Sequence, residues 1–147
     1  MTLCFICVNF QEYEYLLSIP GFGPYISAVV LAAIGTAQRF ENTHQVLKFA
    51  GFDLNANRNG KKRQSAVPVI SKKDKAALRY ALYQAALIAS SSNAQFRGYY
   101  HHLLQGRERE KGIRTKMRVK LAAKLLVIAW TLMKKKQAFD PSYLKAK

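Results

Sequence analysis

The chain has 147 residues, the length of one domain or of one domain with a tail. Half of the residues are hydrophobic and 12% are aromatic, which excludes a disordered chain. The 24 Lys and Arg residues against 8 Asp and Glu residues give a net charge of +16. This charge argues against an ordinary small-molecule enzyme and favours a polyanionic partner, either a nucleic acid or an anionic membrane surface.

The positive charge is concentrated in the second part of the chain. Residues 1–57 have a net charge of −2, and residues 58–147 have a net charge of +18. Two blocks dominate: residues 58–75 contain seven basic residues and one acid, and residues 107–124 contain eight and two. Because an ordinary solvated surface mixes both signs, this separation predicts a surface directed at an anionic partner.

The two cysteines, Cys4 and Cys7, are too few for a disulfide framework, which favours an intracellular, cytoplasmic protein. We interpret their CxxC spacing as two small hydrophobic residues, because the three histidines do not supply the paired spacing of a zinc site. The longest clean apolar run, residues 25–34, is shorter than the about 18 to 20 residues that span a bilayer.

Helical patterns outnumber strand patterns, so we predict an all-α fold: a helix-hairpin-helix, a basic loop and a small bundle of longer helices. The predicted boundaries are a leader over residues 1–15, the helix-hairpin-helix region over 16–51, the loop over 52–70 and the helical remainder over 71–147.

The first region contains a Gly-hydrophobic-Gly hairpin, Gly21-Phe22-Gly23, followed by a helix from Pro24 to Ile34. Both glycines permit a positive φ and a close backbone approach to a ligand, and Phe22 is expected to insert into the core. Backbone amides of the hairpin and of the next helix would then face one phosphate. The alternative is a plain helical connection that binds nothing. A second short helix is predicted over residues 43–50.

The second region is a polar loop that precedes a long helix. Ser71 and Asp74 have the spacing of a capping box, which predicts a helix from Ser71 to about Ser90. Basic side chains beside helix amides suit a phosphodiester backbone. The predicted phosphate-binding residues of the loop and of this helix start are Arg58, Lys61, Lys62, Arg63, Lys72, Lys73 and Lys75.

Two further helices are predicted, over residues 93–105 and 115–136, and Asp140-Pro141 is expected to end the regular structure. On the last helix an apolar face is flanked by Lys116 and Lys120, which we also predict to bind nucleic acid. The residues of that apolar face are Met117, Leu121, Leu125, Ile128 and Leu132.

Six sequence motifs occur in an order that resembles the C-terminal transposase domain of the IS110 insertion-sequence family, which is grouped with IS116 and IS902. The resemblance runs over about residues 16–144. Its motifs are Ile19-Pro-Gly-Phe-Gly-Pro, Phe49-Ala-Gly-Phe-Asp, Arg58-Asn-Gly-Lys, Ile70-Ser-Lys-Lys, Leu78-Arg-Tyr-Ala-Leu-Tyr-Gln-Ala-Ala86 and Lys120-Leu-Ala-Ala-Lys-Leu-Leu with Ala129-Trp.

The resemblance implies a DNA recombinase that works with a structured guide RNA. In the family a RuvC-like nuclease domain with an acidic metal-binding tetrad precedes this domain, and the C-terminal domain contributes a serine nucleophile before a glycine. Here the matching position reads Asn59-Gly60, and an amide cannot attack a phosphodiester as a hydroxyl can. We therefore expect a truncated copy that lacks the nuclease domain and autonomous activity, with no cofactor of its own; the divalent metal would belong to the absent domain.

Three functions follow as hypotheses. The first is a domain that binds DNA and structured guide RNA, with a second copy or a full-length transposase as partner. The second is an active serine-type recombinase subunit, with Ser65 as nucleophile and acids supplied by a partner chain. The third is a basic membrane-surface protein that uses the last helix.

Overall fold

The computed structural model describes the backbone of residues 11–52 and 69–144, and the side chains of residues 11–52 and 75–144. Every regular element in these residues is helical, which confirms the predicted all-α fold. A helix over residues 11–17 comes first. The elements that follow are α2 (Pro24–Ile34), η1 (Ala37–Arg39), α3 (Thr43–Ala50), α4 (Val69–Ser92), α5 (Ala94–Leu104), α6 (Ile113–Lys135) and η3 (Pro141–Leu144).

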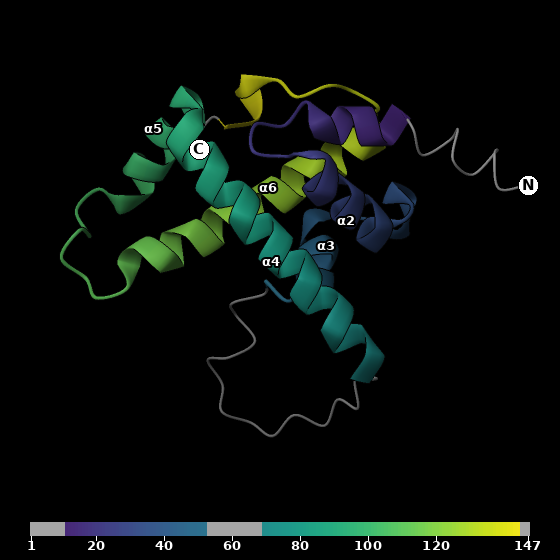
Figure 1. Ribbon diagram of the computed structural model, residues 1–147, viewed down its shortest axis with the longest axis horizontal. Coiled ribbons are helices and arrows are strands. Elements are labelled where there is room, and N and C mark those ends of the chain that lie inside the picture. The colour runs from purple at the N-terminus through teal and green to yellow at the C-terminus, as the bar shows by residue number, and fades with distance from the viewer. Residues whose placement is uncertain (1–10, 53–68, 145–147) are drawn as a thin grey trace, which may run out of the picture.

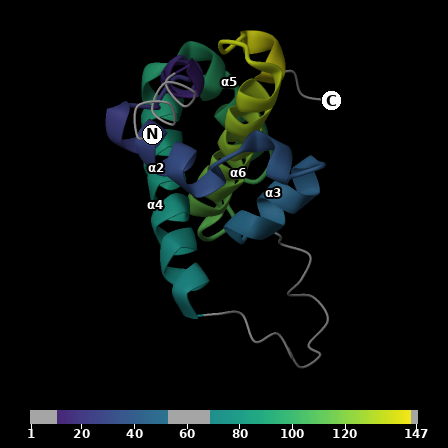
Figure 2. The ribbon, with the colours of Figure 1, turned by 90° about the vertical axis from the view of Figure 1, so that its right-hand side faces the viewer.

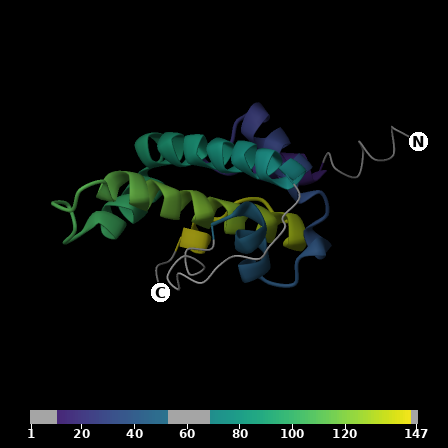
Figure 3. The ribbon, with the colours of Figure 1, turned by 90° about the horizontal axis from the view of Figure 1, so that it is seen from below.

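The two long helices, α4 and α6, form the centre of the molecule. They cross in Figure 1 and run in opposite directions along the molecule in Figure 3. Helix α2 packs on α4 and α3 packs on α6, as Figure 2 shows. The connection between α5 and α6 lies at the end of the molecule away from α2 and α3 (Figures 1 and 3). The fold therefore has two distinct ends, joined by the α4–α6 pair.

The apolar faces that the sequence predicts form the core. On α4, Leu78, Leu82, Ala85 and Ala89 are all fully buried. The predicted face of α6 is buried as well, and it joins α4 in one core, except that Met117 packs in a smaller cluster with α5. Burial of apolar area is the main favourable term in folding, so these two faces hold the central pair together.

Two polar contacts fix the shorter elements to the central pair. The Trp130 indole N–H donates a buried hydrogen bond to the Ala37 carbonyl, with 2.8 Å between the nitrogen and the oxygen. An Arg79 guanidinium nitrogen lies 3.3 Å from the Ala50 carbonyl oxygen, to which it donates at the end of α3. These bonds attach η1 to α6 and α3 to α4.

Most predicted helix ends agree with the structure; the differences are the starts of α4 and α6 and an additional 3-10 helix. Helices α2 and α3 have the predicted bounds, and α5 begins after its cap, Asn93. Helix α4 begins at Val69, so Ser71 lies inside the helix and is not its N-cap. The last two residues of the predicted loop are therefore helical; Pro68 is a start signal of its own in the sequence.

The other two differences are small. Helix α6 begins at Ile113, two residues before the predicted start, because Ile113 belongs to the apolar stripe and is buried. A short 3-10 helix, η3, begins at Pro141, where the sequence predicts an end of regular structure. Leu144 in η3 is buried against the core, which explains why the chain turns back there.

We expect Asn93→Ala to lower the free energy of unfolding by about 1 kcal/mol. The Asn93 side-chain oxygen accepts hydrogen bonds from the backbone N–H groups of Gln95 and Phe96, at 3.0 and 3.1 Å, and Phe96 is fully buried. Urea denaturation followed by circular dichroism measures the change. Asn93→Asp keeps the accepting oxygen and should stay close to the wild type; equal losses in both variants would contradict the capping role.

Candidate nucleic-acid interface

The turn before α2 is the first predicted phosphate site, and the structure gives its residues separate roles. Phe22 is 5% exposed and packs in the core, as predicted. Gly21 has φ +90°, but Gly23 has φ −84° and precedes α2 as its N-cap, so the positive φ that both glycines permit occurs only at Gly21. Gly23 does not need one, because an N-cap residue has extended backbone.

The close backbone approach at Gly21 is made to α4. A Cβ atom added at Gly21 would lie 2.5 Å from the Ala85 carbonyl oxygen and 3.1 Å from the Ala89 nitrogen. Gly21 therefore lets the turn pack on α4. Residues 11–34 contain no Lys or Arg. Phosphate binding by this turn stays a prediction.

The structure places only part of the predicted basic set. Lys72 and Lys73 lie in the first turns of α4, but their side chains are outside the described residues. Lys75 is half-buried on α4, and Lys116 and Lys120 are exposed on α6. The loop residues Arg58, Asn59, Lys61, Lys62, Arg63 and Ser65 lie outside the described residues. The structure thus separates Lys75 from the two lysines of α6.

The first half of α6 and the connection before it carry a dense group of cations, and this segment is here called the basic end. Its single acid–base pair is Arg107 with Glu110, at 2.9 Å, and no ion pair joins the other seven cations to a described residue. The hydrogen bond from Arg107 holds the pKa of Glu110 below its usual value, and Glu110 raises the pKa of Arg107. The eight cations of the basic end are Arg107, Arg109, Lys111, Arg114, Lys116, Arg118, Lys120 and Lys124.

Tyr100 supports the basic end from α5. Its hydroxyl lies 3.4 Å from the Arg114 carbonyl oxygen, to which it donates, and the Arg118 guanidinium carbon lies 5.5 Å from its ring centroid. The Arg118 Nε atom is buried without a hydrogen-bond partner among the described residues. Beside this group is a shallow hollow of about 380 Å³, which Arg97 and His101 also line. The sequence prediction missed Arg97, Arg114 and Arg118; the i, i+4 spacing of the last two was the available signal.

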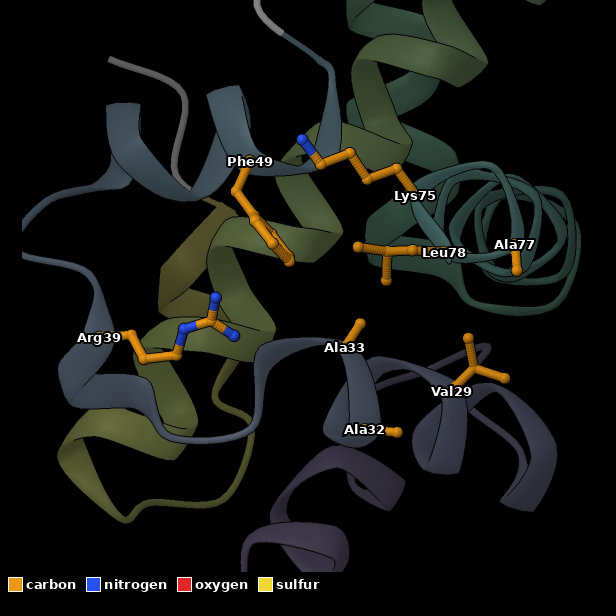
Figure 4. Close-up of a pocket in the computed structure, with 8 residues that line it drawn as sticks. All are labelled: Val29, Ala32, Ala33, Arg39, Phe49, Lys75, Ala77 and Leu78. Carbon is orange, nitrogen blue, oxygen red and sulfur yellow. The ribbon is translucent and has the colours of Figure 1, made fainter. Parts of the chain in front are cut away.

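A second cationic site lies at the other end of the molecule. A cleft of about 450 Å³ is lined by residues of α2, η1, α3 and α4. Figure 4 shows Phe49 pointing into this space, with the Arg39 and Lys75 nitrogens on opposite sides of its ring. The Arg39 guanidinium carbon is 5.1 Å, and the Lys75 Nζ 5.4 Å, from the ring centroid. We call this site the Phe49 cleft; its lining residues are Val29, Ala32, Ala33, Arg39, Phe49, Lys75, Ala77 and Leu78.

Sequence reasoning found one of the two cations of the Phe49 cleft. Lys75 was predicted from the basic block that contains it. Arg39 is one of only two cations in the acidic first part of the chain, and Phe49 has the pattern of an ordinary apolar position of α3. The segment that contains Arg39 and Phe49 meets Lys75 only because α3 packs on α4. No pattern within either segment of the sequence therefore indicates the cleft.

Two further properties of the described part bear on function. No described helix combines the length and apolar character needed to cross a membrane. Over the same residues, no group of three or more His, Cys, Asp or Glu side chains is placed to hold a metal ion.

Comparison with known families gives one match. The family described as "Transposase IS116/IS110/IS902 family" matches residues 13–101, more than half of the chain. The matched segment runs from the helix over residues 11–17 to His101 in α5, so it includes the Phe49 cleft and ends before α6. No curated protein matches the chain.

Proposed function

Because the chain belongs to the IS116/IS110/IS902 family of transposases, we propose that it is a nucleic-acid-binding domain that acts in DNA transposition. Its ligands are the DNA of an insertion element and a structured guide RNA. Both are polyanions, and both would be held through their phosphates by the same cations.

The cations of the basic end are the observation that supports this proposal. Eight cations are gathered on one short stretch of chain, and among the described residues only Arg107 forms an ion pair there, although Lys116 also helps to lower the pKa of Glu110. Lys116 and Lys120 are exposed and one helical turn apart on α6. Unpaired cations at this density repel one another, and a phosphate backbone relieves that repulsion while it releases condensed counterions.

The chain's part in transposition, as we propose it, is to hold nucleic acid and not to cut it. The nucleophile of the alternative hypothesis, Ser65, and the asparagine at the family's serine position, Asn59, both lie outside the described residues. Serine-type catalysis with acids from a partner chain therefore stays a prediction.

A salt titration tests the proposal. We expect the logarithm of the affinity for duplex DNA to fall linearly with the logarithm of the salt concentration, by about 0.9 per phosphate neutralised. The double variant Lys116→Gln/Lys120→Gln should then reduce this slope by about 2. Gel shifts with duplex DNA and with a structured RNA, side by side, measure both slopes.

The matched control is Lys134→Gln/Lys135→Gln. It removes the same charge from the other end of α6, where Lys134 lies over Trp130 and Lys135 lies over Tyr143. This control should leave the slope nearly unchanged. Affinity that is flat with salt, or equal losses in both double variants, would overturn the proposal. Flotation with anionic vesicles tests the membrane-surface hypothesis on the same proteins.

A further inference from the structure

We propose that the Phe49 cleft binds one unpaired nucleotide, with its base between the Phe49 ring and the aliphatic side chains of α2 and α4 and its phosphate at Lys75. The inference rests on the proposed function, since it assigns a second, different kind of contact to the same nucleic-acid ligand. The basic end binds the phosphates of a nucleic acid of any sequence or shape. The Phe49 cleft would bind only a base that is not stacked between neighbouring bases.

The size and lining of the cleft suit a flat, mostly apolar group. Its volume of about 450 Å³ falls within the roughly 300 to 1,000 Å³ of small-molecule sites. Its floor and far wall are aliphatic, formed by Val29 and Ala33 of α2 and by Leu78 of α4. Phe49 contributes an aromatic ring, half-buried and directed into the space (Figure 4). Aromatic rings bind bases of any identity through stacking.

The two cations give the cleft its preference for a phosphate. Arg39 is held in place, because it donates to the Ile34 carbonyl at 3.2 Å and its guanidinium carbon lies 5.2 Å from the Phe40 ring. Lys75 approaches from the opposite side of Phe49. Among the described residues that line the cleft, none is an acid. An apolar ligand would give Arg39 and Lys75 no anionic partner, and an acidic peptide would give the Phe49 ring no flat group to stack on.

The base must be unpaired for geometric reasons. In a duplex each base is stacked between its neighbours, so its face cannot reach a ring that lies inside a cleft. A bulged, looped or single-stranded nucleotide presents that face at little cost. Such nucleotides occur in DNA opened for recombination and in structured RNA, and the chemistry they offer to the cleft is the same.

The experiment compares duplexes that differ by one extra nucleotide. A fluorescent adenine analogue is placed as a single-base bulge in a DNA duplex, as the same bulge in an RNA duplex, and within a fully paired DNA duplex. We expect the whole chain to bind the bulged DNA about tenfold more tightly than the paired DNA, because a base stacks favourably on an aromatic ring whatever its identity. The analogue's fluorescence should fall on binding, and the RNA arm shows which backbone the cleft accepts.

Two substitutions locate the effect. Phe49→Leu keeps an apolar side chain and removes the ring, so it should abolish the preference for the bulge and leave affinity for paired DNA unchanged. Lys75→Gln should reduce the same preference several-fold without changing the core. The controls are Tyr80→Leu, which removes an exposed aromatic ring of α4, and Lys48→Gln, which removes an exposed charge of α3; neither residue lines the cleft.

The outcomes separate this inference from the proposed function. Salt-dependent binding to paired DNA with no preference for either bulge overturns the nucleotide cleft and leaves the proposed function standing. No binding to any duplex overturns both. If Phe49→Leu does not fold, as judged by its circular dichroism and melting temperature, Lys75→Gln against Lys48→Gln decides. Equal effects of those two substitutions would overturn the cleft.

Discussion

Replacing Gly21 by alanine is expected to lower the free energy of unfolding by about 2 to 5 kcal/mol. The added Cβ would lie 2.5 Å from the Ala85 carbonyl oxygen and 3.2 Å from the Ala89 Cβ, and the residue has φ +90°. Overpacking against a backbone atom costs about 1 to 3 kcal/mol, and a left-handed backbone at a residue with a Cβ costs roughly 1 to 2 kcal/mol more. Urea denaturation followed by circular dichroism measures the loss.

Gly23→Ala is the matched control, two residues along the same turn. Its φ is −84°, and a Cβ there would meet nothing within 4 Å. We expect its stability to change by less than about 1 kcal/mol. If the Gly21→Ala protein is as stable as the Gly23→Ala protein, the Gly21 backbone is not in close contact with α4. If Gly23→Ala weakens DNA binding without loss of stability, the phosphate contact predicted for this turn gains direct support.

Trp130→Ala is expected to cost about 3 to 5 kcal/mol, the usual range for loss of a buried aromatic side chain. Trp130 is 5% exposed, and its indole N–H donates to the Ala37 carbonyl across 2.8 Å. Because η1 contains both Ala37 and Arg39, the loss should also loosen the segment that holds one cation of the Phe49 cleft. Thermal and urea denaturation measure the stability, and binding to the bulged duplex measures the second effect.

Trp130→Phe separates packing from the hydrogen bond. It keeps most of the ring and leaves the Ala37 carbonyl without its donor, which should cost about 1 to 3 kcal/mol. A Trp130→Phe protein with wild-type stability would mean that the hydrogen bond does not hold η1 to α6. In that case Arg39 would have to be positioned by its bond to Ile34 and by the two phenylalanine rings alone.

The sequence predicts this fold well because its helix signals are local. Proline in the first turn of α2, glycine after α2 and α3, and Asn93 before α5 each act within one helical turn of themselves. The apolar stripes of α4 and α6 likewise repeat at helical spacing. The start of α4 was wrong because Ser71 offered a plausible cap inside a helix that begins at Val69.

The sites were less predictable because they depend on contacts between distant segments. The positive φ of Gly21 was expected, yet its partner α4 lies far along the chain, so the close approach was assigned to a ligand. The Phe49 cleft depends on α3 meeting α4, which a hydrogen bond from Arg79 helps to fix. Charge counting found the basic end, since there the cations are neighbours in sequence.

The separation of the two cationic sites sets a minimum length for any ligand that occupies both. The basic end is at the start of α6, and the Phe49 cleft lies toward the other end of the α4–α6 pair. Helix α6 has 23 residues and is therefore about 34 Å long. That length is close to one helical turn of B-form DNA, about 34 to 36 Å or ten base pairs. A bulged oligonucleotide whose paired arm is much shorter than ten base pairs should therefore bind with the affinity of one site, and a step in affinity should appear as that arm is lengthened towards one turn. A fully paired duplex, which cannot enter the Phe49 cleft, should show no such step.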